Sequence, residues 1–148
     1  MPGNMMLARR IKDAVVPATT GTMAVLPTGA TNGIQLTSDT STAGSLTGDA
    51  AYVEVVAANA ITSDFRITSI GVDSFSAATR FHIVIATGAA SSETVVGTVL
   101  VMCGATADAP TIPVTMPNIP ANTRVSMKCA VQSGTSRTCR VNINYVTV

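Results

Sequence analysis

The chain has 148 residues, enough for a single domain with its own hydrophobic core. Its formal net charge of +1 provides no long-range field to attract nucleic acid or an anionic membrane, so we expect neither partner. Charged residues make up only 11% of the sequence, whereas a free-standing soluble domain has about a quarter, so we expect a partner to cover much of the surface.

The amino-terminal segment, residues 2–16, combines an apolar stripe with basic side chains. Leu7, Ile11 and Val15 would share one face of a helix that ends before Pro17. Such a helix is too short to be stable without a partner surface or the body of the domain. We therefore predict an arm, helical or extended, that binds a partner through five residues: Leu7, Arg9, Arg10, Ile11 and Lys12.

The order of residues in this arm is not that of a secretory signal, because the basic residues follow Met5-Met6-Leu7-Ala8 and no longer apolar run comes after them. No stretch of the sequence approaches the roughly 18–20 apolar residues needed to span a bilayer. We expect synthesis in the cytoplasm and no membrane partner.

Residues 18–49 consist mainly of Thr, Gly, Ser and Ala. Val25-Leu26 and Ile34-Gln35-Leu36 are brief apolar islands between turn-forming residues, which allow short strands at most. The sequence thus predicts an arm and an extended segment over residues 1–49, followed by a folded domain over residues 50–148.

Strand patterns recur at short spacing from residue 50 onward. Val53 and Val55 alternate with polar residues, and the apolar row changes phase between residues 65–67 and 70–72, which predicts a β-bulge near Ser69. Phe81, Ile83 and Ile85 form the next inward row. Residues 94–103 are apolar on both faces, which predicts a central strand or a strand covered by another subunit. A further strand is predicted over residues 111–116.

Residues 124–132 and 138–148 show strict period-two alternation around Ser-Gly-Thr-Ser, which predicts an antiparallel β-hairpin. The inward rows are apolar: Val125, Met127, Cys129 and Val131, then Cys139, Val141, Ile143 and Tyr145. With these, about seven strands are expected, which is typical of one all-β domain, a β-sandwich or jelly roll, with very little helix.

Arg124, Lys128 and Arg140 fall on the outward rows of the predicted hairpin. They would form a patch for anionic groups of a partner, or they would keep exposed strands soluble and discourage edge pairing. Few aromatic residues are interleaved with them, which argues against a nucleic-acid platform.

The three cysteines are an odd number, and none has Cys-x-x-Cys spacing, so we expect buried thiols used as small apolar residues. Two alternatives remain. Cys129 and Cys139 would face each other in a hairpin and would allow a disulfide. A zinc site would need Cys103, Cys129, Cys139 and His82, which lack characteristic spacing, so no metal or cofactor is expected.

The sequence offers no motif for catalysis. His82 lies in Phe-His-Ile-Val-Ile, where alternation points it away from the inward row, and no nucleophile elbow accompanies it. The carboxylates are scattered singly: Glu54, Asp64, Asp73 and Glu93. Phosphate-loop, dinucleotide and calcium-loop motifs are missing from the sequence. We expect a protein that is not an enzyme.

Two stretches, Ala86-Thr-Gly-Ala-Ala-Ser-Ser-Glu93 and Ile119-Pro-Ala-Asn-Thr-Arg124, together with the closing Val141-Asn-Ile-Asn-Tyr145, carry a family resemblance. Residues 50–148 resemble the small β-sandwich capsid cement, or decoration, proteins of tailed bacteriophages. These are patterns of strand and turn, and the segment before residue 50 has no counterpart in them. The resemblance implies a jelly-roll-like fold and no ligand-binding motif.

The function that the resemblance implies is that of a structural virion protein on the capsid exterior, which clamps neighbouring capsomers. Its partner would be the major capsid protein, and it would be a homo-oligomer on the capsid surface. The alternative is a receptor- or glycan-binding module of a phage fibre or tail. That alternative needs exposed rings for sugars to stack on, and the chain has only two tyrosines and three phenylalanines.

Overall fold

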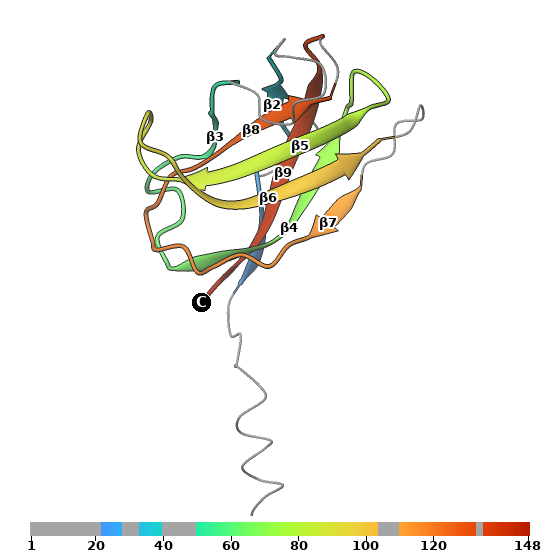
Figure 1. The fold of residues 1–148 in the computed structure, drawn as a ribbon. Coiled ribbons are helices and arrows are strands. Elements are labelled where there is room, and N and C mark those ends of the chain that lie inside the picture. Colours follow the sequence, from blue (N-terminus) through green and yellow to red (C-terminus); the bar gives the residue numbers. More distant parts are fainter. Residues whose placement is uncertain (1–21, 28–32, 40–49, 104–109, 133–134) are drawn as a thin grey trace, which may run out of the picture.

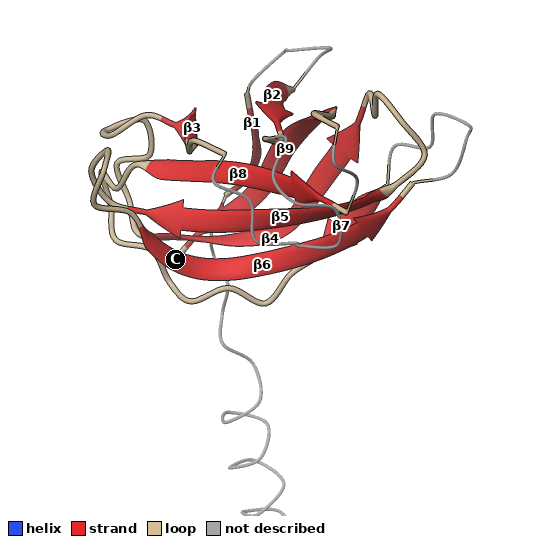
Figure 2. Cartoon of the chain, turned by 45° about the horizontal axis from the view of Figure 1, so that its top comes forward, coloured by secondary structure: helices blue, strands red, loops and turns tan. Residues whose placement is uncertain are grey.

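The alternating rows of the sequence form two antiparallel sheets that pack face to face as an all-β sandwich (Figure 1). The computed structural model describes residues 22–27, 33–39, 50–103, 110–132 and 135–148. The predicted arm residues Leu7, Arg9, Arg10, Ile11 and Lys12 lie outside these ranges. Within them, all regular structure consists of strands joined by loops and turns (Figure 2).

The first sheet, sheet A, has the order β1-β9-β4-β7, and β2 also pairs with β9. Its strands are β1 (Met23–Leu26), β2 (Ile34–Thr37), β4 (Phe65–Asp73), β7 (Thr111–Pro113) and β9 (Thr138–Thr147). The second sheet, sheet B, has the order β3-β8-β5-β6. Its strands are β3 (Val53–Val56), β5 (Arg80–Thr87), β6 (Thr94–Met102) and β8 (Val125–Val131).

The core lies between the inward rows of the two sheets, where apolar burial supplies the main stabilisation. The predicted row on β5 is confirmed, because Phe81, Ile83 and Ile85 are fully buried. On β4, Phe65 packs edge-on against Tyr145 of β9 with ring centres 5.7 Å apart. The predicted bulge near Ser69 is also confirmed, since the register of β4 against β9 shifts between residues 67 and 69.

The predicted hairpin of the last two strands is wrong, although both strands exist. β8 pairs with β3 and β5 in sheet B, whereas β9 pairs with β1, β2 and β4 in sheet A. Two strands that face one core from opposite sheets show the same inward rows as two paired strands, and the connection crosses the roughly 10 Å between the sheets. The inward rows themselves, from Val125 to Ile143, are buried as predicted.

The prediction of a central strand over residues 94–103 is wrong as well, because β6 is an edge of sheet B. Its outward side chains stay exposed, so strong apolarity on both faces does not reflect burial within this chain. The alternative, a strand covered by another subunit, stays a prediction.

Two short strands precede residue 50 and belong to the sandwich. β1 pairs with residues 143–146 of β9, and β2 pairs with residues 138–141 of the same strand. The two therefore lie end to end along one edge of sheet A. The described part of the chain has nine strands, of which the sequence predicted the seven from residue 50 onward.

Candidate interaction surfaces

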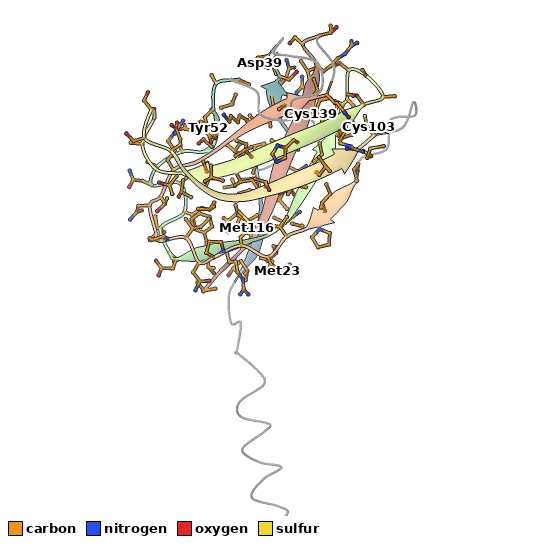
Figure 3. All side chains as sticks on the ribbon, viewed as in Figure 1. Met23, Asp39, Tyr52, Cys103, Met116 and Cys139 are labelled. Atoms are coloured by element: carbon orange, nitrogen blue, oxygen red, sulfur yellow. The ribbon has the colours of Figure 1, made fainter. Side chains whose placement is uncertain are left out.

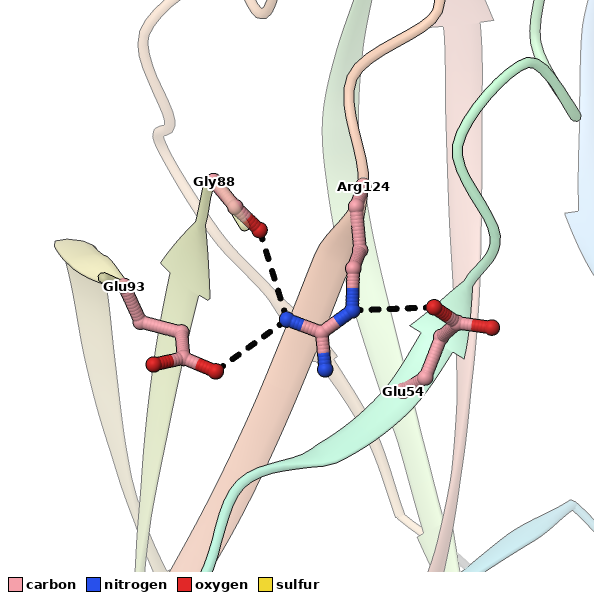
Figure 4. A network of polar contacts seen from close by, with 4 residues as sticks. All are labelled: Glu54, Gly88, Glu93 and Arg124. Carbon is pink, nitrogen blue, oxygen red and sulfur yellow. Dashed lines mark hydrogen bonds and ion pairs between the residues drawn. The ribbon is translucent and has the colours of Figure 1, made fainter. Parts of the chain in front are cut away.

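Arg124 lies at a junction of three segments, where two carboxylates hold it (Figure 4). Its Nε donates to Glu54 Oε2 at 2.9 Å, and its Nη1 donates to Glu93 Oε1 at 3.1 Å and to the carbonyl oxygen of Gly88 at 3.3 Å. Glu54 is on β3, Gly88 and Glu93 lie in the turn between β5 and β6, and Arg124 precedes β8. The charge of Arg124 is thus matched within the chain, and its contacts join three neighbouring segments of sheet B.

Glu93 is the more enclosed carboxylate of this junction, with 9% of its side chain exposed against 48% for Glu54. Burial raises the pKa of Glu93, but backbone donors and the Arg124 guanidinium together outweigh burial and hold the pKa below its ordinary value of 4.5. Glu93 is therefore ionised at neutral pH.

The two other basic residues of the predicted patch lie in different sheets. Lys128 is on β8 of sheet B, and its Nζ lies 5.0 Å from the centre of the Tyr52 ring in a cation–π contact. Arg140 is on β9 of sheet A, where it is paired in register with Asp73 on one side and Gln35 on the other. Because β8 and β9 do not pair, Arg124, Lys128 and Arg140 do not form a common patch.

The three cysteines are buried free thiols. Cys103 contacts the carbonyl oxygens of Ala77 and Thr79 at 2.9 and 3.3 Å, and it lies towards the same end of the sandwich as Cys139 (Figure 3). Cys129 and Cys139 approach each other from opposite sheets, and their thiols form a hydrogen bond. This bond and burial raise the pKa of Cys139 far above its usual value, while the same bond lowers the pKa of Cys129. The interpretation as buried apolar thiols is confirmed.

His82 does not join the thiols. It alternates with the buried Phe81 and Ile83 and therefore lies on the outer face of sheet B, between Ala130 of β8 and Leu100 of β6. Across the described ranges, no three His, Cys, Asp or Glu side chains are grouped so that they could hold a metal ion.

Exposed apolar side chains gather at two separate places on the described surface. The first, the β1 surface, consists of Met23 and Val25, which are 73% and 46% exposed. It lies at the edge of sheet A, and β1 begins at residue 23, whereas the predicted arm ends at residue 16. Figure 3 shows Met23 near the end of the sandwich that lies away from Cys103 and Cys139.

The second place, the β6 edge, comprises β6 with its three exposed large apolar side chains: Val95, Leu100 and Met102, at 52%, 52% and 69%. A groove of about 400 Å³ runs between residues 97–100 of this strand and residues 112–116, which include part of β7. Met116 lies over Gly97 on the inner side, so that the groove closes onto the core. β6 thus presents an open strand edge and an apolar outer row together.

Sequence reasoning missed the two partners of Arg124 because they lie 70 and 31 residues away in the chain. The signal for the β6 edge was present in the residues, since residues 94–103 are uncharged and apolar on both faces.

Comparisons with known proteins found no matching family model, no similar curated protein and no similar solved structure. No helix that could cross a membrane occurs in the described ranges.

Proposed function

We propose that this chain is a capsid cement protein, which binds the outside of an assembled phage capsid and clamps neighbouring capsomers. The observation that carries the proposal is the pair of exposed apolar surfaces, the β1 surface and the β6 edge, at separate places on one small sandwich. A clamp needs at least two contacts, and each of these surfaces would bury apolar area on binding.

The low charge of the chain supports this role, because a protein with 11% charged residues gains by having its surface covered. The stretches that carry the family resemblance also support it. Ala86–Glu93 and Ile119–Arg124 meet at the Arg124 junction, where they hold strands together. In this role they would set the shape of the clamp.

The proposed mechanism is mass action. A protein that binds only the assembled lattice lowers the free energy of the lattice relative to free subunits, and stabilisation rises with concentration until the sites are full. No chemical step is required of any side chain.

The test uses capsids prepared without this protein. Purified protein added back should restore resistance to heat or internal pressure, and the restored resistance should saturate with concentration. Val25→Lys, on the β1 surface, should raise the concentration needed. Capsids that are equally robust with and without the protein would refute the cement role.

Counting copies per virion against the major capsid protein separates this role from its rival. A stoichiometric ratio supports cement, whereas a handful of copies would identify a fibre or tail module instead.

A further inference from the structure

The outer side of β6 is an unused strand edge. β6 pairs with β5 on one side, and on the other side residues 94–102 make no backbone hydrogen bond to any described residue. Such a row of N–H and C=O groups is a template for another strand, and natural proteins usually block it.

The other sheet edges in the described structure each carry a blocking feature. β7 has three residues and ends in Pro113, while β1 and β2 have four residues each. β3 also has four residues, and its outward Glu54 is bound to Arg124. β6 has nine residues, Thr-Val-Val-Gly-Thr-Val-Leu-Val-Met, with neither a charge nor a proline. β6 carries a bulge where its register against β5 shifts at residues 95–97, which leaves residues 97–102 as the longest regular, uncharged edge in the described structure.

We propose that the β6 edge binds a second copy of this chain, with the two β6 strands antiparallel across a two-fold axis. The four-stranded sheets B would then form one continuous eight-stranded sheet. The exposed row with Leu100 and Met102 would pack beside the same row of the partner copy, which removes apolar surface from water.

Charge favours a second copy as the occupant. Pairing a strand with itself brings like side chains together, and β6 has no charges to repel each other. The ends of the strand carry opposite charges: Arg80, whose Nε lies 3.4 Å from Met102 Sδ, is at one end, and the Arg124 junction, where the carboxylates of Glu54 and Glu93 face one guanidinium, is at the other. Antiparallel pairing brings the Arg80 end of one copy towards the Glu93 end of its partner, an attractive arrangement.

The inference does not rest on the proposed capsid role, because it concerns the purified protein alone. In such a dimer the two contacts of the clamp would be the two β1 surfaces, one on each copy. Light scattering or sedimentation should give twice the 15.1 kDa mass of the chain. Leu100→Lys should give the monomer mass, because it places a charge in the apolar row that the partner copy would cover. Val148→Lys, at a position as exposed as Leu100, should leave the dimer intact.

Cross-linking tests the geometry independently of any loss of folding. Thr98 is exposed at the middle of β6, so Thr98→Cys should form disulfide-linked dimers with oxidised glutathione. Thr62→Cys, an exposed threonine in a loop, should not. The proposal would be overturned if the wild type had the monomer mass at protein concentrations well above about 10 µM. A dimer that survives Leu100→Lys would also overturn it, as would cross-linking that is no stronger at Thr98 than at Thr62.

Discussion

At the scale of single residues, the Arg124 junction couples stability to pH. The pKa of Glu93 is lower in the folded chain than its ordinary value of 4.5, so its ionised form stabilises the fold at pH values above 4.5. This stabilisation is lost as the pH falls through the folded-state pKa, when Glu93 takes up a proton.

Arg124→Met should therefore destabilise the protein most at neutral pH, because it leaves Glu93 enclosed without its cation. The difference in unfolding free energy between wild type and variant should shrink as the pH falls below 4.5 and through the lowered pKa of Glu93 in the folded chain. Urea unfolding at several pH values measures this, with Lys128→Met as the control. A difference that is constant with pH would contradict the assigned role of Glu93.

Gly33 shows how one backbone position fixes the entry to β2. It has φ of +33°, and a Cβ there would lie 2.7 Å from the carbonyl oxygen of Val141, which cannot move without disrupting β9. We expect Gly33→Ala to cost about 1–3 kcal/mol of unfolding free energy, as measured by denaturant titration. At Gly97 the obstructing atoms belong to the end of the Met116 side chain, which can rotate away. An equal or larger loss for Gly97→Ala would count against this explanation.

At the scale of elements, the alternation of apolar and polar residues predicted the strands, and a change of phase in the apolar row predicted the bulge of β4. Which strands pair with one another could not be predicted in the same way. The inward row of β8 looks the same whether its neighbour is β9 in a hairpin or β9 across the core, because period-two alternation reports only which face is buried. The two apolar faces of β6 correctly predicted a strand, but the predicted central position of that strand is wrong. A central strand and a strand at an interface have the same apolar composition.

The Arg124 junction was beyond prediction for a related reason. Its members come from three elements whose contact depends on the pairing of β3, β8 and β5, which sequence alone left open. The exposed row of β6 was predictable as composition, but its position at an edge was not.

The orientation of β9 gives a test at the same scale. Ile143 is fully buried, so Ile143→Ala should cost about 2–5 kcal/mol through lost burial and an unfilled cavity. Val25 lies in the same sheet but is 46% exposed, so Val25→Ala should change the unfolding free energy by no more than about 0.5 kcal/mol. Chemical denaturation compares the two, and similar losses for both would mean that the assigned facing is wrong.

At the scale of the whole molecule, folding and partner binding should be separable. A chain that begins at residue 22 keeps all nine described strands, so we expect its melting temperature to match that of the full chain. It lacks Leu7, Arg9, Arg10, Ile11 and Lys12, and we therefore expect it to lose affinity for capsids. Unchanged decoration of capsids by the truncated protein would refute the predicted role of the arm.

The position of β9 in the chain has a consequence for biosynthesis. Three of the other four strands of sheet A, namely β1, β2 and β4, pair with β9, yet all of them leave the ribosome earlier. Sheet B can begin sooner, because β5 and β6 are neighbours in the chain and in space. Until residues 138–147 emerge, β1 and β2 have no strand to pair with, and β4 has only the three-residue β7. Apolar residues such as Leu36 and Ile67 then lack their final cover, a state in which chains are prone to aggregate.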